Sequence, residues 1–207
     1  VATVKILVSM AWFVMIASHL TMGVAWHRFT AFPNIWFRRN ADGRPALGAL
    51  PEMHSDGKPI DFEDPDEDSI FGAGAVEDFT WKALLDFTSC TECGRCQSQC
   101  PAWLTDKPLS PKLVVMDLRE HAYRKATVGD DRALVGPGAV PGGASGTADQ
   151  IARWRDGREG AQGDGSSGGD DASADAVIHP DVLWSCTSCG ACVEQCPVDI
   201  EHVDHIM

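Results

Sequence analysis

The chain has 207 residues, a formal net charge of -13 and eight cysteines. Phosphate binding needs clustered Lys and Arg, so this acidic balance argues against nucleic acid as a partner. The length allows one or two domains. Glycine-rich tracts reduce the number of residues that can pack into a hydrophobic core, so we expect a small packed unit. The chain begins with Val1 and ends at Met207 within a predicted helix, so we expect it to be a piece of a longer protein.

The first predicted element is a transmembrane helix. Residues 6–26 contain no charged side chain over 21 positions, which at about 1.5 Å per residue spans roughly the 30 Å of a bilayer core. Aromatic and basic residues follow up to Arg39, as in the interfacial collar of a membrane helix. By the positive-inside rule, the rest of the chain is then expected on the cytoplasmic side of the inner membrane. A signal peptide and a buried helix are the alternatives.

Two histidines lie in or beside this apolar run. An ionisable side chain inside a bilayer is a functional candidate, so His19 or His27 could ligate a b-type haem. They are eight residues apart, which is roughly 12 Å along a helix, so they would not serve one haem together. A partner histidine would have to come from a helix outside this chain. The alternative, which we favour, is an interfacial His27 and a hydrogen-bonded His19 packed between helices.

The rest of the chain is divided into a linker and one domain. Residues 40–76 are predicted to be an acidic linker, because six acids crowd DFEDPDED at 61–68 and like charges repel. A docking site for a basic partner is the alternative. Residues 77–207 are predicted to form a helix-rich domain. Within it, residues 136–176 hold eleven of the twenty glycines and are predicted to be a flexible insertion.

Helices are predicted on both sides of each cysteine motif. One is expected to begin near Asp78 and to lead into the first motif. The next should begin with Ser110 as N-cap and Pro111 at the first helical position. Short helices are expected from Pro180 into the second motif and over 199–207 after it.

All eight cysteines lie in two copies of one pattern, CTECGRCQSQCP at 90–101 and CTSCGACVEQCP at 186–197. Three thiolates at positions 1, 4 and 7 of a loop can wrap one face of a [4Fe-4S] cubane. Gly94 and Gly190 are expected to adopt left-handed backbone, which lets amide hydrogens approach the inorganic sulfides. The duplication indicates a pseudo-twofold unit with two similar sites.

In two-cluster ferredoxins with a C-x2-C-x2-C-x3-C-P run, the fourth cysteine binds the other cluster. We carry this crossed ligation onto the present sequence. The predicted ligands are Cys90, Cys93, Cys96 and Cys196 for the first cluster, and Cys186, Cys189, Cys192 and Cys100 for the second. The crossed ligands would join the two halves of the domain. The fold could then tolerate the 41-residue insertion between the motifs, since each doubling of loop length adds only about 0.6 kcal/mol to the free energy of loop closure.

Other chemistry is less well supported. Zinc favours two separate C-x2-C pairs over an unbroken triple with a fourth cysteine marked by proline. Disulfides are disfavoured because cytoplasmic thiols stay reduced. No base, nucleophile or substrate-binding constellation stands out, so no catalytic residue is predicted. Four further histidines lie in polar sequence and are expected to be exposed: His121, His179, His202 and His205.

The sequence resembles a family of iron–sulfur proteins. The resemblance is carried by FTAFPNIWFRR at 29–39, FGAGAVEDFTWKALLDFTSCTECGRCQSQCPA at 71–102 and HPDVLWSCTSCGACVEQCPVDIEHVDHI at 179–206. These resemble heterodisulfide-reductase-like proteins fused to a membrane domain like the nitrate reductase gamma subunit, and above all the membrane-bound electron-transfer-flavoprotein:quinone oxidoreductases. No cysteine follows Cys196, so the cysteine-rich CCG domains of that family would lie outside this chain.

The expected architecture is therefore mainly α-helical, with one transmembrane helix followed by an α-helical ferredoxin-like domain that binds two [4Fe-4S] clusters. The resemblance implies an oxidoreductase that relays electrons from a reduced electron-transfer flavoprotein, through further domains or subunits, to menaquinone. Another respiratory dehydrogenase or a heterodisulfide-reductase-like enzyme would share the same cysteines. The alternative of a different class is a zinc-folded membrane adaptor whose acidic loop recruits a partner.

Overall fold

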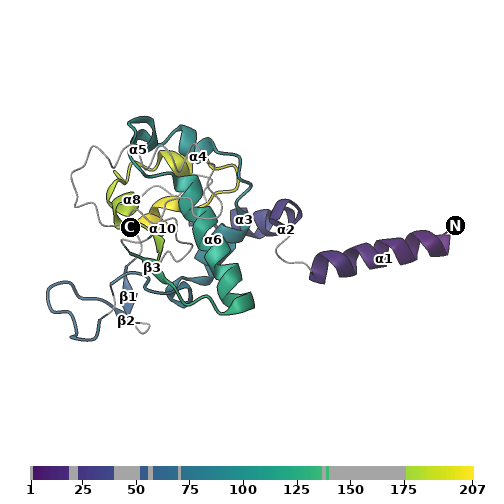
Figure 1. Cartoon of the computed structure of the whole chain (residues 1–207), viewed down its shortest axis with the longest axis horizontal. Helices are drawn as coiled ribbons and strands as arrows, with labels where there is room; N and C mark the ends of the chain where they lie inside the picture. The colour runs from purple at the N-terminus through teal and green to yellow at the C-terminus, as the bar shows by residue number, and fades with distance from the viewer. Residues whose placement is uncertain are drawn as a thin grey trace.

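The structure is a computed structural model, and it describes residues 2–18, 23–39, 52–55, 58–69, 71–136, 139 and 176–207. The longest helix of the domain, α6 (Pro111–Val128), runs through the middle of it (Figure 1). The segments that bear the cysteines gather around the first half of this helix (Figure 1). Their short helices are α4 (Arg95–Ser98), α5 (Pro101–Leu104), α8 (Pro180–Trp184), α9 (Ala191–Glu194) and α10 (His202–Ile206).

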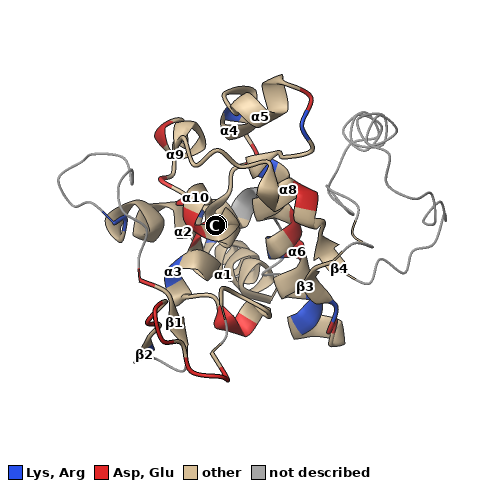
Figure 2. Ribbon diagram, turned by 90° about the vertical axis from the view of Figure 1, so that its left-hand side faces the viewer, with Lys and Arg blue, Asp and Glu red and all other residues tan. Residues whose placement is uncertain are grey.

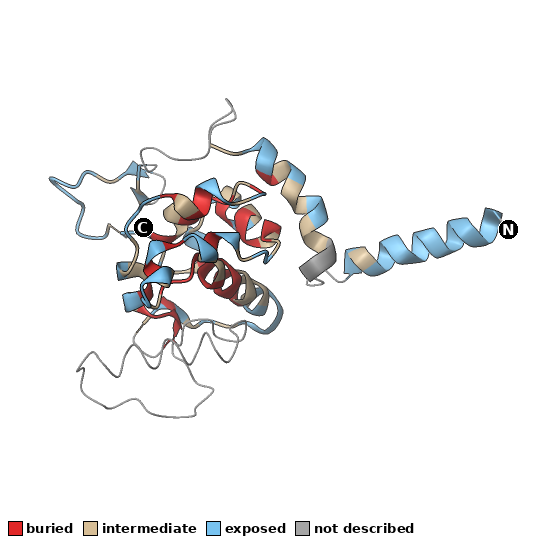
Figure 3. Cartoon of the chain, turned by 90° about the horizontal axis from the view of Figure 1, so that it is seen from above, coloured by how far each residue is buried: buried red, intermediate tan, exposed pale blue. Residues whose placement is uncertain are grey.

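The predicted transmembrane helix is wrong. Helix α1 covers Ala2–Ser18, and a separate helix, α2, covers Gly23–Trp36. Among the described residues, none of the helices combines the length and the apolar character that a membrane crossing requires. Helix α1 is exposed almost throughout and extends away from the domain (Figure 3). The end of the apolar run belongs instead to α2, which packs against α3 (Trp81–Ser89) of the domain.

Two of the residues predicted as a membrane collar, Arg38 and Arg39, contact the domain. Arg38 forms an ion pair with Asp199 at 3.3 Å, and the backbone N–H of Arg39 donates to the carboxylate of Glu201 at 2.9 Å. The Arg39 guanidinium also pairs with Asp204. The last two basic residues of this stretch are thus paired with acids of the domain.

Asn34 anchors α2 to the loop that follows the second cysteine motif. Its side chain is fully buried, and its Nδ2 donates to the carbonyl of Val198 at 2.8 Å. A few residues earlier, Thr30 Oγ1 donates to the carbonyl of Thr88 at 3.1 Å. These bonds tie α2 both to the end of α3 and to the segment directly after Cys196.

Replacing Asn34 with Ala should therefore weaken this attachment by about 1–3 kcal/mol, because the buried carbonyl of Val198 loses its donor. The change would be measured as a lower denaturation midpoint and as faster proteolysis between α2 and the domain. Ile35→Ala is the matched control, since Ile35 lies on the same helix and is 38% exposed. Equal midpoints for Asn34→Ala and the unmodified chain would show that the bond does not hold α2.

The helix before the first motif begins later than predicted. Val76–Asp78 forms a 3-10 turn, η1, and α3 starts at Trp81 with Thr80 as its N-cap. The hydroxyl of Thr80 accepts from the N–H of Ala83 at 3.2 Å. Asp78 instead accepts from two backbone N–H groups upstream, which explains why the helix does not begin there.

The helix after the first motif is confirmed. Helix α6 begins at Pro111, and the hydroxyl of its N-cap Ser110 accepts from the N–H of Leu113 at 3.3 Å. It ends at Gly129, which has a φ of 73° and supplies the left-handed residue that commonly follows a helix. The predicted short helix from Pro180 is confirmed as α8. The one predicted over 199–207 is present in part, as α10.

The segments on either side of the insertion pair with each other. Strand β3 (Ala133–Val135) lies parallel to β4 (Ala176–Ile178), with Ala133 opposite Ala176. Nearly all of the predicted insertion at 136–176 lies outside the described residues. The domain boundaries remain predictions.

The described part of the acidic linker contains a small hairpin. Strand β1 (His54–Ser55) pairs antiparallel with β2 (Lys58–Pro59). The acids that follow it are exposed over 61–68 and form the red loop beside the hairpin in Figure 2. A solvated loop and a docking site would both be exposed, so the choice of a solvated loop remains a prediction.

Candidate metal centres

The two cysteine loops have left-handed residues at equivalent positions. Gly94 and Gly190 each precede a short helix, and their φ values of 77° and 72° confirm the predicted left-handed conformation. Two positions before each glycine, Glu92 and Ser188 also have positive φ, at 57° and 52°. Equivalent residues thus bend both chains in the same way, which is what the repeated sequence predicts.

Each loop contributes to two pockets, and the cysteines of the two motifs are mixed between them. The cysteines that line the first pocket are Cys90, Cys93, Cys96 and Cys196. Those that line the second pocket are Cys100, Cys186, Cys189 and Cys192. Each fourth cysteine therefore lines the pocket of the other motif.

The pockets share a wall. Cys96 from the first motif and Cys192 from the second belong to one buried cluster with Val193, and Val203 packs against it. The short helices α4 and α9 that carry these cysteines contact each other. Electron carriers bound in the two pockets would therefore be near neighbours.

Burial makes the thiols reluctant to ionise in the absence of a cation. It raises the pKa of Cys96 and of Cys192 to about 12, and repulsion from neighbouring thiolates adds to the effect. The pKa of Cys196 is raised to about 11 by burial, with a further contribution from Cys90 and Cys93. Thiolates are the metal-binding form, so these pockets need positive charge to assemble.

The cysteines supply the thiolate ligands that iron–sulfur clusters use. All eight are free thiols. Among the residues that the structure describes, no three or more Cys, His, Asp or Glu side chains converge closely enough to hold one metal ion. A zinc site would draw four sulfurs to about 2.3 Å from one ion. In a [4Fe-4S] cluster each cysteine binds a different iron, so the sulfurs stand further apart. The assignment of each cysteine to a cluster remains a prediction.

The first pocket is also lined by residues that the sequence did not single out. Lys112, at the start of α6, and His202, at the start of α10, both line it. The Nδ1 atom of His202 lies 3.0 Å from the carbonyl of Ile200. Only the folded chain brings these residues to the first motif, so no local pattern could have identified them.

The expectation that the later histidines are exposed is wrong. His121 and His179 are 2% and 4% exposed, and His202 is 1% exposed. His179 caps α8 by accepting from the N–H of Asp181, and the side chain of His205 is only 4% exposed. The prediction relied on polar neighbours in the sequence, whereas the fold turns these side chains inward.

A buried carboxylate links the helix before the first motif to the helix after the second. Asp86 of α3 is 0% exposed, and its Oδ1 lies 2.7 Å from Lys82 Nζ. Its Oδ2 lies 3.0 Å from His205 Nε2 and accepts from the N–H of Glu201 at 3.3 Å. The sequence analysis missed this network because its members are far apart in the chain.

The haem prediction gains no support. His19 lies outside the described residues, and His27 is a half-buried residue of α2. Neither the arrangement of α2 nor the comparisons below point to haem.

Residues 89–200 match a family model described as a 4Fe-4S dicluster domain. The chain is also 36% identical over 174 residues to the "Probable iron-sulfur-binding oxidoreductase FadF" of Bacillus subtilis, which covers 79% of this chain and 23% of that protein. It is 32% identical over 202 residues to a "Probable membrane-anchored ferredoxin" of Chromohalobacter salexigens, covering 92% of this chain and 26% of the relative.

A third relative is the "EtfAB:quinone oxidoreductase" of Syntrophomonas wolfei, at 31% identity over 184 residues, covering 88% of this chain and 22% of that protein. No solved structure matches the chain. These matches confirm the resemblance to iron–sulfur oxidoreductases. The chain spans about a quarter of the length of each relative.

Proposed function

Because the chain belongs to the 4Fe-4S dicluster domain family, we propose that it is the electron-relay segment of a larger iron–sulfur oxidoreductase. In this proposal it passes electrons from a reduced electron-transfer flavoprotein toward menaquinone. The observation that carries the proposal is the pair of adjoining pockets, each lined by four cysteines.

The chain's own residues would hold the clusters. We propose the crossed ligand sets, with Cys196 completing the first pocket and Cys100 completing the second. Each cluster would supply one-electron oxidation and reduction. The thiolates and the left-handed loops hold the site, while the buried wall at Cys96 and Cys192 keeps the pockets adjacent. Cys93 and Cys189 are exposed, so each pocket has one edge that a redox partner can approach.

The proposed partners follow from the relatives. The printed name of one relative specifies EtfAB and quinone, and that of another specifies an iron-sulfur-binding oxidoreductase. We propose the same donor and acceptor classes for the protein to which this segment belongs, with further domains or subunits completing the path. We also propose that it works at the inner membrane with the cluster domain on the cytoplasmic side. This location is supported by the lipid nature of the quinone and by the relative named as membrane-anchored.

Reduction by the flavoprotein tests this proposal. The oxidised chain would be mixed anaerobically with reduced electron-transfer flavoprotein, and the loss of iron–sulfur absorbance followed in a stopped-flow instrument. Reduction that saturates with flavoprotein concentration is expected. Flavodoxin poised at the same potential is the control and should react far more slowly. Equal reduction rates with both donors would contradict the assignment of electron-transfer flavoprotein as the specific donor. That result would favour another respiratory dehydrogenase.

A further inference from the structure

The two pockets differ in charge although their loops match. Each is closed by the first turns of α6 and α10, whose second residues are Lys112 and Val203. Lys112 lines the first pocket, whereas Val203 lines the second. The first residues of the same helices alternate as well, because His202 lines the first pocket and Pro111 the second. At both positions the polar residue, Lys112 or His202, lines the first pocket. The apolar residue, Val203 or Pro111, lines the second.

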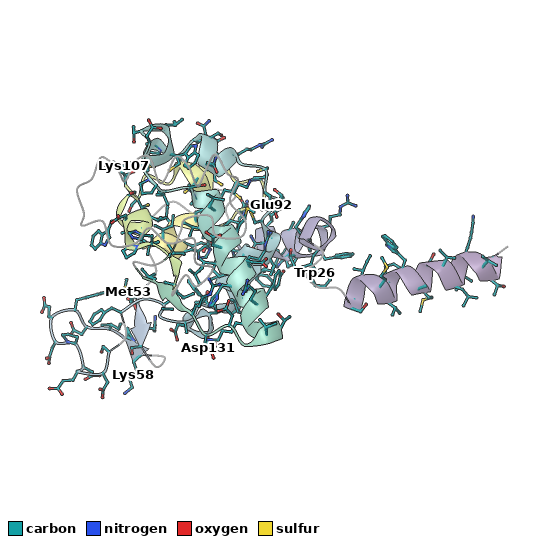
Figure 4. The ribbon with its side chains drawn as sticks, in the orientation of Figure 1. Trp26, Met53, Lys58, Glu92, Lys107 and Asp131 are labelled. Carbon is teal, nitrogen blue, oxygen red and sulfur yellow. The ribbon has the colours of Figure 1, made fainter. Side chains whose placement is uncertain are left out.

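Among the described residues that line the first pocket, Lys112 carries a charge without an ion-pair partner. Glu92 also lines that pocket, but its carboxylate is paired with Arg119 at 2.6 Å. Glu92 is labelled in Figure 4. Lys112 is half-buried and has no carboxylate partner among the described residues. The residues that line the second pocket include no charged side chain apart from its cysteines.

A similar backbone hydrogen bond to a cysteine sulfur is present at each pocket. The N–H of Ile200 donates to Cys196 Sγ in the first pocket at 3.4 Å. The N–H of Ser188 donates to Cys186 Sγ in the second pocket, also at 3.4 Å. The left-handed glycines are equivalent too. The contrast between the pockets therefore rests on the side chains that α6 and α10 contribute.

We propose that Lys112 gives a cluster held in the first pocket a higher midpoint potential than one held in the second. A cluster gains negative charge when it is reduced, and a nearby ammonium stabilises the reduced form. The apolar lining of the second pocket offers no such stabilisation. The inference rests on the proposed function, since it requires two clusters. Lys112 is a positioning residue, because the electrostatic field of its ammonium group acts on the cluster without a bond to it.

Redox titration followed by electron paramagnetic resonance tests the proposal on the anaerobic 207-residue chain. Two separate midpoint potentials are expected. Lys112→Met should lower the higher potential and leave the lower one unchanged. Lys112→Arg should keep the original value because it keeps the charge. The reciprocal variant, Val203→Lys, should raise the lower potential.

Lys125→Met is the matched control. It removes the same charge from the same helix, thirteen residues further along, which is about 20 Å away. Neither potential should move in this variant. Equal potentials in the unmodified chain would overturn the proposal. So would a Lys112→Met protein that holds both clusters and keeps both potentials.

The failure of this inference can be told apart from failure of the proposed function. Iron and sulfide content would be measured in every sample before titration. Unmodified chain without clusters would refute the relay itself, whereas two clusters with equal potentials would refute only the role of Lys112. If Lys112→Met loses a cluster, the proposal is tested by the lower midpoint potential of Val203→Lys. An unchanged lower potential in that variant overturns the proposal.

Discussion

Replacing Cys100 with Ser is expected to abolish the cluster of the second pocket while the first is kept. Cys100 belongs to the first motif, but it lines the pocket built mainly by the second motif. Serine offers a hard hydroxyl oxygen in place of the soft thiolate that iron–sulfur clusters require. Iron should fall from about eight to about four atoms per chain. Magnetic coupling between the two reduced clusters should disappear from the paramagnetic resonance spectrum.

Two partner variants identify which cluster is lost. Cys189 and Cys93 are the exposed second cysteines of the two motifs. Crossed ligation predicts that Cys100→Ser leaves the same residual spectrum as Cys189→Ser. If Cys100→Ser matched Cys93→Ser instead, each motif would hold its own cluster and the proposed ligand sets would be wrong. Cys196→Ser should in turn match Cys93→Ser.

Replacing Asp86 with Ala is expected to destabilise the domain by about 3–5 kcal/mol, because it removes one partner of a buried ion pair. The ammonium of Lys82, which is 13% exposed, loses its partner at 2.7 Å. His205 and the N–H of Glu201 lose an acceptor as well. In urea, a loss of about 3 kcal/mol lowers the midpoint by roughly 1 M or more. Iron–sulfur absorbance and far-ultraviolet circular dichroism would follow the transition.

Asp131→Asn is the control for this prediction. The Asp131 side chain is 84% exposed, and its contact with Lys125 is 3.9 Å. It is labelled in Figure 4. An exposed pair contributes about 0–1 kcal/mol, so this variant should unfold near the midpoint of the unmodified chain. If Asp86→Ala did the same, the network would not hold α3 to α10.

The contribution of Asp86 should also depend on pH. Burial alone would raise the pKa of Asp86, but the hydrogen bond and charge of His205, together with Lys82, outweigh it and hold the pKa below its usual value of 3.8. Stability from a depressed carboxyl pKa is fully present above the unfolded value and is lost as the pH falls through the folded one. The gap between the unmodified chain and Asp86→Ala should therefore narrow as the pH falls below about pH 4.

The repeated motifs made the cysteine loops predictable from the sequence. The spacing of the cysteines and the glycine before each short helix are local features, so they carry through to the structure directly. The N-cap at Ser110 is another local signal, and it marks the observed start of α6. Membership of the dicluster family also follows from these residues.

The errors arose where tertiary contacts outweigh local patterns. The uncharged run up to Trp26 was predicted to form one membrane helix. Its last residues belong instead to α2, which Asn34 anchors to the domain. His202 read as an exposed residue because its neighbours are polar, but the fold buries it at the first pocket. Lys112 carried no signal, since only the fold places it at the first pocket.

The presence of two clusters is tested most directly by one measurement on anaerobically purified chain. Iron, sulfide and zinc content would be determined together with the low-temperature paramagnetic resonance spectrum after reduction by dithionite. About eight irons, about eight sulfides and a spin-coupled pair of [4Fe-4S]+ signals are expected. Zinc without a paramagnetic signal, in protein never exposed to air, would contradict the relay and leave a zinc-folded adaptor as the better account.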